Sequence, residues 1–140
     1  GADVLVGFPG ESHEAFEGTL RLVEALPLTY LHVFRYSPRP GTPAAGFSNV
    51  VPPAVAKERA AALRNLGREK RKAHFRSCLG EAYSVLVENV EPGERPVGSG
   101  LSDNYIPVSF PADCAGVGDV VRVVAERLEG DHVTGRVESF

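Results

Sequence analysis

The sequence predicts a fold of class α/β plus β, in which a β-α-β unit and a linking helix precede a small five-stranded barrel. The first observation is a valine-rich run at residues 3–8 and an alternating run at residues 30–36, separated by apolar side chains at helical spacing. The second is a long helical pattern at residues 54–79. The third is a series of short strand patterns, with turn residues between them, after Gly80.

The predicted β-α-β unit has clear local boundaries. Pro9-Gly10 ends the first run, Ser12 is placed to cap a helix, and Pro27 ends that helix. The apolar side chains at helical spacing are Phe16, Leu20, Val23 and Leu26. A continuous apolar run is typical of a strand that is buried on both faces of a parallel sheet. We therefore expect further strands beside these two.

A proline-rich loop at residues 37–53 leads into the predicted linking helix. This helix carries apolar side chains on or near one face, namely Val55, Leu63, Leu66 and Ala73. Gly67 costs it about 1 kcal/mol relative to alanine, and Gly80 is a natural end. Its carboxylates, Glu58 and Glu69, are outnumbered by cations: Lys57, Arg59, Arg64, Arg68, Lys70, Arg71, Lys72 and Arg76. The helix is locally cationic although the net charge of the chain is -3.

The barrel is predicted from strand patterns at residues 83–90, 95–101, 105–110, 117–127 and 132–139. Pro92-Gly93, residues 102–104 and residues 129–131 supply turn signals between them. Closing such a sheet removes its exposed edges, which favours a barrel over an open sheet. These patterns divide the chain into three parts: an N-terminal unit at residues 1–53, a helix at residues 54–79 and a barrel at residues 80–140.

Composition narrows the class of protein. An apolar fraction of 43% with mixed charge is typical of a soluble globular protein. No stretch of about eighteen apolar residues and no leader pattern are present, so we expect a cytoplasmic protein without a membrane partner. The sequence contains no methionine, so we expect a segment before Gly1. Cys78 and Cys114 lack the spacing of metal ligands, and no metal site is predicted.

Two segments carry a resemblance to a known family. Residues 31–45, with Arg39-Pro-Gly-Thr42 after Tyr36-Ser37, closely resemble the radical-SAM tRNA methylthiotransferases, and the resemblance continues through Val55, Lys57, Arg59 and Leu63. Residues 3–11 resemble the radical-SAM strand that lies against the adenine of S-adenosylmethionine. The resemblance implies that residues 1–53 are the C-terminal part of a radical-SAM barrel and form the last β-α-β unit of an incomplete barrel. The resemblance implies a cofactor-binding group and a substrate-mouth group, which are Val6, Gly7, Phe8 and Glu11, and Tyr36, Ser37, Arg39 and Thr42.

Each of these groups has a structural alternative. Gly7 is typical of a strand-turn-helix corner that needs glycine for its geometry. Arg39 is a fixed cation suited to a carboxylate, phosphate or carbamoyl oxygen, but arginine in a loop also braces backbone carbonyls. The residues alone leave both alternatives open.

The remainder of the chain resembles the RNA-binding TRAM module, through Val85-Leu-Val-Glu88 and residues 100–108. The resemblance implies an OB-like barrel in which Asn104 and Tyr105 lie beside RNA, although an aromatic turn residue often plugs a barrel. The helix leading into it would contact phosphates through Arg64, Arg68, Lys70, Arg71, Lys72 and Arg76. A solvated cationic face is the alternative.

The family resemblance implies a parent transferase that methylthiolates a tRNA adenosine beside the anticodon, with S-adenosylmethionine and two 4Fe-4S clusters as cofactors. His32 before Val33-Phe34 most resembles the threonylcarbamoyladenosine branch, and the isopentenyladenosine branch is next. The branch that modifies a ribosomal protein ranks third, because its loop usually departs from the Arg-Pro-Gly-Thr pattern. The chain lacks the cluster cysteines, so we expect it to hold no cluster, to carry no catalytic residue and to be inactive alone. The implied partners are tRNA and the N-terminal domains of the same polypeptide. The alternatives are a stand-alone TRAM-type RNA-binding module without catalysis and a small apolar-ligand protein.

Overall fold

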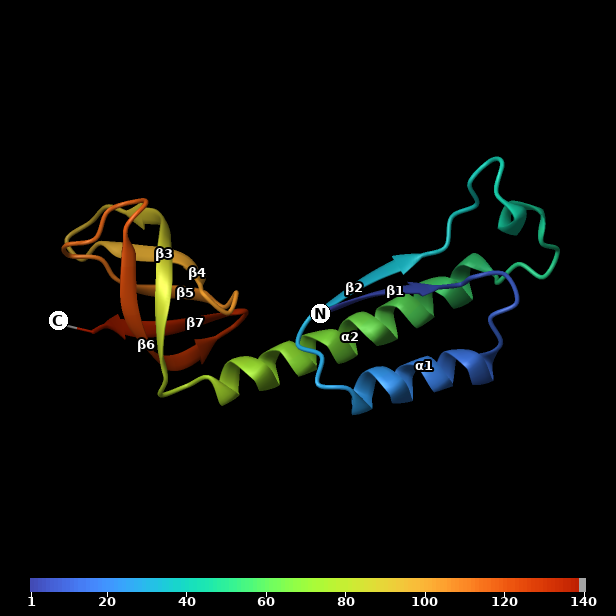
Figure 1. Ribbon diagram of the computed structural model, residues 1–140, viewed down its shortest axis with the longest axis horizontal. Coiled ribbons are helices and arrows are strands. Elements are labelled where there is room, and N and C mark those ends of the chain that lie inside the picture. The colour runs from blue at the N-terminus through green and yellow to red at the C-terminus, as the bar shows by residue number, and fades with distance from the viewer. Residues whose placement is uncertain (139–140) are drawn as a thin grey trace. The chain divides into compact units, whose positions relative to one another are not determined.

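The computed structural model describes residues 1–138 and divides into two compact units, residues 1–71 and the residues from 72 onward (Figure 1). The first contains β1 (Ala2–Val6), α1 (His13–Ala25), β2 (Leu31–Arg35), the 3-10 helix η1 (Pro43–Gly46) and most of α2 (Pro53–Ser77). The second contains β3 (Ala82–Glu91), β4 (Val97–Ser102), β5 (Pro107–Pro111), β6 (Val120–Glu129) and β7 (His132–Val137). Mixed α and β structure with a five-stranded sheet confirms the predicted class in general terms.

In the first unit β1 and β2 pair in parallel, with Ala2 opposite Leu31 and Val6 opposite Arg35. Ser12 caps α1, because its side chain accepts a hydrogen bond of 3.0 Å from the backbone N–H of Ala15. The helix ends at Ala25, so Leu26 lies just outside it and is 41% exposed. The predicted β-α-β unit is therefore confirmed, with its helix one residue shorter than the apolar spacing indicated.

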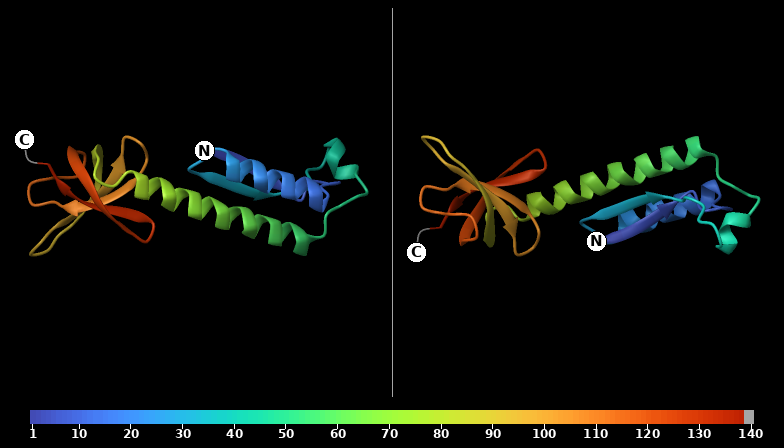
Figure 2. Two further views of the ribbon diagram at one scale, coloured as in Figure 1. Left: turned by 90° about the horizontal axis from the view of Figure 1, so that it is seen from below. Right: turned by 90° about the horizontal axis from the view of Figure 1, so that it is seen from above.

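The core of this unit lies on one face of the two strands, where α1 and α2 pack (Figures 1 and 2). Its buried side chains are Val6, Phe16, Val23, Ala60 and Leu63. The opposite face carries Leu5 and Phe34, which lie opposite each other in the register and are 47% and 51% exposed. The expectation of a first strand buried on both faces is thus wrong for this structure, because its helices cover only one face of the pair.

Helix α2 approaches β2 closely at Gly67. A Cβ atom at this position would lie 3.2 Å from the Cδ1 atom of Leu31. The glycine that weakens the helix by its propensity therefore allows the helix to pack against the strand. Leu31 and Leu66 both pack against the core of the first unit.

The second unit is a closed barrel in the order β3-β4-β5-β7-β6. Neighbouring strands are antiparallel except for β5 and β7, which are parallel. Its interior is filled by side chains of the strands and of Ile106 and Ala112, which flank β5. Phe75 at the end of α2 and Cys78 just after it complete the core. The largest fully buried ones are Val85, Val87, Ile106, Val123 and Val133.

The five predicted strands are all present, with shifted ends. The third begins at Pro107, so Tyr105 lies in the turn before it, and the fourth begins at Val120 instead of residue 117. Ser139, at which the last strand was predicted to end, lies outside the described residues. Within residues 1–138, no helix is both long and apolar enough to cross a membrane.

Candidate functional site

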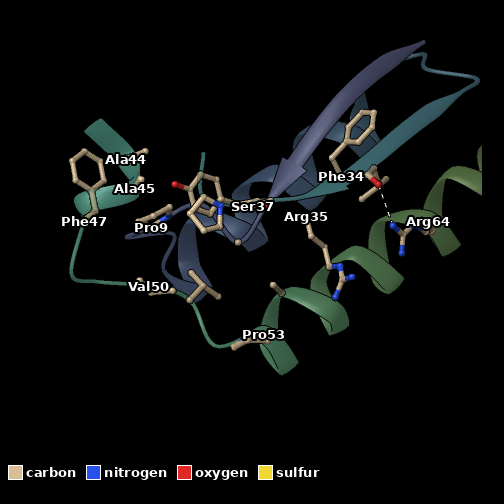
Figure 3. Close-up of a pocket in the computed structure, with 16 residues that line it drawn as sticks. Pro9, Phe34, Arg35, Ser37, Ala44, Ala45, Phe47, Val50, Pro53 and Arg64 are labelled. Carbon is tan, nitrogen blue, oxygen red and sulfur yellow. Dashed lines mark hydrogen bonds between the residues drawn. The ribbon is translucent and has the colours of Figure 1, made fainter. Parts of the chain in front are cut away.

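A cavity of about 600 Å³ lies in the first unit where β1 and β2 end (Figure 3). Its walls come from the ends of both strands, the loop with η1, and the first turns of α2. The carboxyl ends of parallel strands are where α/β proteins normally build ligand sites. Of the predicted site residues, Gly7, Tyr36, Ser37 and Arg64 line this cavity.

Tyr36 brings a buried hydroxyl to the wall of this cavity. Its hydroxyl is buried and meets no donor or acceptor in the part of the chain that the structure describes. The ring packs edge-on against Phe8, with 5.3 Å between the centroids, and Phe8 packs in the same way against Phe47 at 6.3 Å. Because a buried hydroxyl without a partner is costly, this atom is a natural contact for a polar group of a ligand.

Gly7 is required by the geometry of the corner after β1. Its φ of 76° lies in the left-handed region, and a Cβ atom there would lie 2.8 Å from the Cβ atom of Ala56. The strand-turn-helix alternative is therefore sufficient to explain this glycine. Gly7 and Ala56 both line the cavity.

Glu11 is bound by its own chain. Its carboxylate accepts a hydrogen bond of 3.0 Å from the backbone N–H of Gly7 and forms an ion pair with Arg59. Arg59 also donates to the backbone carbonyl of Glu11 at 2.9 Å and lies over the ring of Phe16, 5.3 Å from its centroid. The side chains of Arg59 and Glu11 are 8% and 13% exposed. The carboxylate thus locks the corner after β1 onto α2.

The sequence identifies Arg59 as one of the cations of the helix and one of the residues of the family resemblance, but it does not predict the ion pair with Glu11. The sequence does contain a signal that Arg59 is buried, because this residue shares the apolar face of α2 with Ala56, Ala60 and Leu63. A charged residue on a buried face needs a partner of opposite charge. The pattern did not indicate which carboxylate that partner is.

The remaining residues of the two predicted groups lie apart from the cavity wall. Val6 is fully buried in the core, and its backbone carbonyl accepts a hydrogen bond of 2.8 Å from Tyr36. The Thr42 hydroxyl donates to the backbone carbonyl of Arg39 at 2.8 Å, which closes the loop turn. The guanidinium of Arg39 makes no hydrogen bond among residues 1–138, so bracing of the loop by this side chain is not observed.

Half of the predicted RNA-binding cations on α2 hold the first unit together. Arg64 donates to the backbone carbonyl of Val33 at 3.1 Å, shown as the dashed line in Figure 3. Lys70 donates to the carbonyl of Glu24 at 2.9 Å, near the end of α1. Arg71 lies over the ring of Tyr30 at 5.8 Å. Of the others, Arg68 donates a hydrogen bond to Asn65 on its own helix, while Arg68 and Arg76 are exposed and Lys72 is half-buried.

The turn before β5 presents Tyr105 to solvent. Tyr105 is 81% exposed, so it does not plug the barrel. Asn104 is engaged within the protein, because its amide oxygen accepts from the Ser102 hydroxyl at 2.6 Å and its amide nitrogen contacts the Cys78 sulfur at 3.9 Å. Of the two residues predicted to lie beside RNA, Asn104 is therefore held by contacts within the protein, whereas the ring of Tyr105 is exposed.

A groove of about 560 Å³ in the barrel gathers three arginines that the sequence did not single out. Arg95, Arg127 and Arg136 come from the loop before β4, from β6 and from β7. Arg136 pairs with Glu126 at 3.1 Å and Arg127 with Glu129 at 3.7 Å, and all four side chains are largely exposed. Exposed ion pairs are weak, so an anionic ligand can displace them. Barrel closure brings the arginines together, which spacing along the chain does not indicate.

Cys78 is buried and Cys114 exposed, and both are free. No group of three or more histidine, cysteine, aspartate or glutamate side chains that could hold a metal ion occurs among the described residues. A side-chain hydrogen bond with Cys78 raises the pKa of Tyr83 to about 12. Partial burial and the charges of Cys78 and Glu81 act in the same direction.

Comparison with known proteins identifies relatives of one kind, although no family model matches the chain. A tRNA-2-methylthio-N(6)-dimethylallyladenosine synthase of Ehrlichia canis is 47% identical over 88 residues, which are 63% of this chain and 20% of the relative. That of Ehrlichia chaffeensis is 42% identical over the same length. The threonylcarbamoyladenosine tRNA methylthiotransferase MtaB of Rickettsia prowazekii is 41% identical over 110 residues, 79% of this chain and 24% of the relative. The matches thus span a fifth to a quarter of these relatives.

Proposed function

We propose that this chain, whose homologues are tRNA methylthiotransferases, is the C-terminal part of such an enzyme. In this proposal the first unit supplies part of the mouth of the active site and the barrel with α2 supplies RNA binding. The observation that carries the proposal is the high identity of the relatives over most of this chain. The parent enzyme would transfer a methylthio group to a tRNA adenosine beside the anticodon, and the tRNA partner implies a cytoplasmic location.

The cavity at the ends of β1 and β2 supports the active-site part of the proposal. Gly7 is part of the cavity wall, and the Tyr36 hydroxyl offers a hydrogen bond in this largely apolar wall. The residues fit a contact with the bound S-adenosylmethionine of the parent, which would supply the radical and the methyl group. Glu11 is taken by Arg59, so we propose that it positions this wall without touching the ligand.

The iron-sulfur clusters do not fit onto the described residues, which contain no set of metal-ligating side chains. We therefore propose that other segments of the parent hold both clusters. On its own the chain would bind RNA without modifying it.

RNA binding is supported by the cations that remain available. Arg68, Lys72 and Arg76 follow one another at intervals of four along α2, the spacing of neighbours on one helix face. The barrel adds the arginine groove, defined by Arg95, Arg127 and Arg136. The closed five-stranded barrel supports an OB-like module, a class that often binds oligonucleotides. These patches can act locally despite a net charge of -3, because charges are screened beyond about 8 Å.

For the modified base we propose the threonylcarbamoyladenosine branch. The relative named for this base matches 110 residues, whereas the two named for dimethylallyladenosine match 88 residues. Identity is higher for the latter pair, so the dimethylallyladenosine branch is the second candidate. Mass spectrometry of tRNA from cells lacking the parent gene identifies which methylthio nucleoside is lost, and loss of the dimethylallyl form alone would overturn the first choice.

The test of RNA binding compares two double variants with the same change of charge. Arg68→Ala with Arg76→Ala removes two exposed cations of α2 that, among residues 1–138, make no hydrogen bond outside this helix, and Arg21→Ala with Arg122→Ala removes two exposed cations elsewhere. We expect the first variant to make the log-log salt slope of tRNA affinity shallower by up to about 1.5, since each lost phosphate contact contributes roughly 0.7 to 0.9. Equal salt slopes for the two variants would refute the assignment of phosphate contacts to α2.

A stand-alone TRAM-type RNA-binding module without catalysis is the alternative. It is favoured by the division of the chain into two compact units. The reading frame upstream of the codon for Gly1 separates the two functions. A continuous frame that encodes C-x-x-x-C-x-x-C supports the enzyme, and a frame without those cysteines supports the module.

A further inference from the structure

An exposed apolar row crosses three neighbouring strands of the barrel. Val120 of β6 lies opposite Leu86 of β3, and Leu86 lies opposite Leu101 of β4. These side chains are 66%, 47% and 36% exposed, and they line a groove of about 390 Å³ together with Tyr105. Adjacent exposed apolar side chains of this kind mark a contact surface more often than isolated ones do.

Tyr105 is held in an unusual backbone conformation beside this row. Its φ of 62° lies in the left-handed region, and it is the only non-glycine residue with positive φ among residues 1–138. Such a conformation persists where the surroundings enforce it, and it is frequent at functional sites. Here the Ser102 backbone carbonyl accepts from the Tyr105 N–H at 2.9 Å, and the Ser102 hydroxyl accepts from the Ile106 N–H at 2.8 Å. The turn thus presents an exposed ring from a fixed backbone.

The polar side chains of the groove restrict what can occupy it. Glu88 and Asp103 line it, and none of its described lining residues is a lysine or arginine. A phosphate would therefore meet two carboxylates and no cation. Carboxylates accept hydrogen bonds from the exocyclic amines of cytosine and adenine, and any base can stack on an aromatic ring.

We propose that this groove binds an unpaired nucleobase of RNA, stacked on Tyr105 and flanked by the row Leu86, Leu101 and Val120, with a preference for bases that carry an exocyclic amine. This inference rests on the proposed RNA-binding function and deepens it. Phosphates bind at cationic surfaces such as the arginine groove, and this site adds base preference to that binding.

The test uses the full chain and two single-stranded RNA hexamers, C6 and U6, which differ in the cytosine amine and the uracil carbonyl at the same ring position. Tyr105→Phe keeps the ring, and Tyr105→Asn removes it while tolerating the left-handed conformation. We expect C6 to bind at least about fivefold more tightly than U6. Tyr105→Asn should weaken C6 binding at least about fivefold with an unchanged salt slope, and Tyr105→Phe should stay within about twofold.

The Asp103→Asn, Glu88→Gln double variant tests the base preference. The inference predicts that the ratio of C6 to U6 affinity falls toward one in this variant. If instead the variant binds both hexamers more tightly by the same factor, the carboxylates only repel RNA, and the proposed base preference is overturned.

Titration with tRNA separates this inference from the proposed function. If tRNA and both hexamers bind Tyr105→Asn with the same affinity as the wild type, the nucleobase site is overturned. The proposed RNA binding then stands, and the groove is instead a surface for a protein partner. If the wild-type chain does not bind tRNA, both proposals fail. A circular dichroism spectrum that matches the wild type establishes that each variant is folded.

Discussion

Replacing Glu11 by alanine should destabilise the first unit severely. The change removes the partner of the Arg59 guanidinium, whose side chain is only 8% exposed, and also the acceptor of the Gly7 N–H. Arg59 keeps its hydrogen bond to the Glu11 backbone carbonyl and its contact with the ring of Phe16. A largely buried cation is then left without a counter-charge.

The magnitude follows from the burial of the pair. Breaking a buried ion pair by removing one partner costs about 3–5 kcal/mol, because the remaining charge stays desolvated. Whole domains are commonly stable by only about 5–15 kcal/mol, so this loss removes a large part of the stability of a 71-residue unit. The barrel does not contain this pair and should be unaffected.

Amide hydrogen exchange measures both units in one sample. Glu11→Ala should lower the protection free energy of the slowest amides in α1 and β1 by about 3–5 kcal/mol, or abolish their protection, while the barrel changes by less than about 0.5 kcal/mol. Glu14→Ala is the matched control, because Glu14 is exposed in the first turn of α1, and it should cost less than about 1 kcal/mol. A loss below about 1 kcal/mol for Glu11→Ala would contradict the structural role and return Glu11 to the ligand-binding group.

Three other changes test separate parts of the structure. Gly7→Ala should lower the stability of the first unit by more than about 1 kcal/mol in the same exchange experiment, whereas Gly18→Ala, in open space within α1, should raise it by up to about 1 kcal/mol. Ser102→Ala should cost the barrel about 1–3 kcal/mol in urea unfolding, because it leaves a buried backbone N–H without its acceptor. The raised pKa of Tyr83 favours its neutral form in the folded state. Its contribution to stability is therefore complete below pH 10 and is lost as the pH rises toward 12. Ultraviolet titration should show one tyrosine that ionises at higher pH than the others, and Tyr83→Phe should remove this step.

The elements of the fold follow from local patterns and were predicted well. Ser12 and Pro27 delimit α1 because capping and proline geometry act within a few residues. The five strands follow from alternation and turn residues for the same reason. The ends were less accurate, as at Tyr105, where hydrogen bonds within the turn place the start of β5 two residues later.

The candidate sites depend on contacts between distant positions, which local patterns do not contain. Glu11 and Arg59 are 48 residues apart, so their pairing appears only after α2 packs on the corner after β1. The arginine groove likewise needs the closed barrel to bring its three side chains together. Tyr105 was singled out by its resemblance to a family pattern, but its exposure and its left-handed conformation come from the fold of the turn.

Chemical-shift mapping of the isotope-labelled chain with a tRNA anticodon stem-loop tests the central claim, that this chain binds tRNA through the exposed cations of α2 and the arginine groove. The account predicts saturable shifts at the amides around Arg68 and Arg76 and around Arg95, which weaken as salt is added. A stem-loop that leaves all of these amides unshifted, while the barrel resonances remain those of a folded domain, would contradict the account.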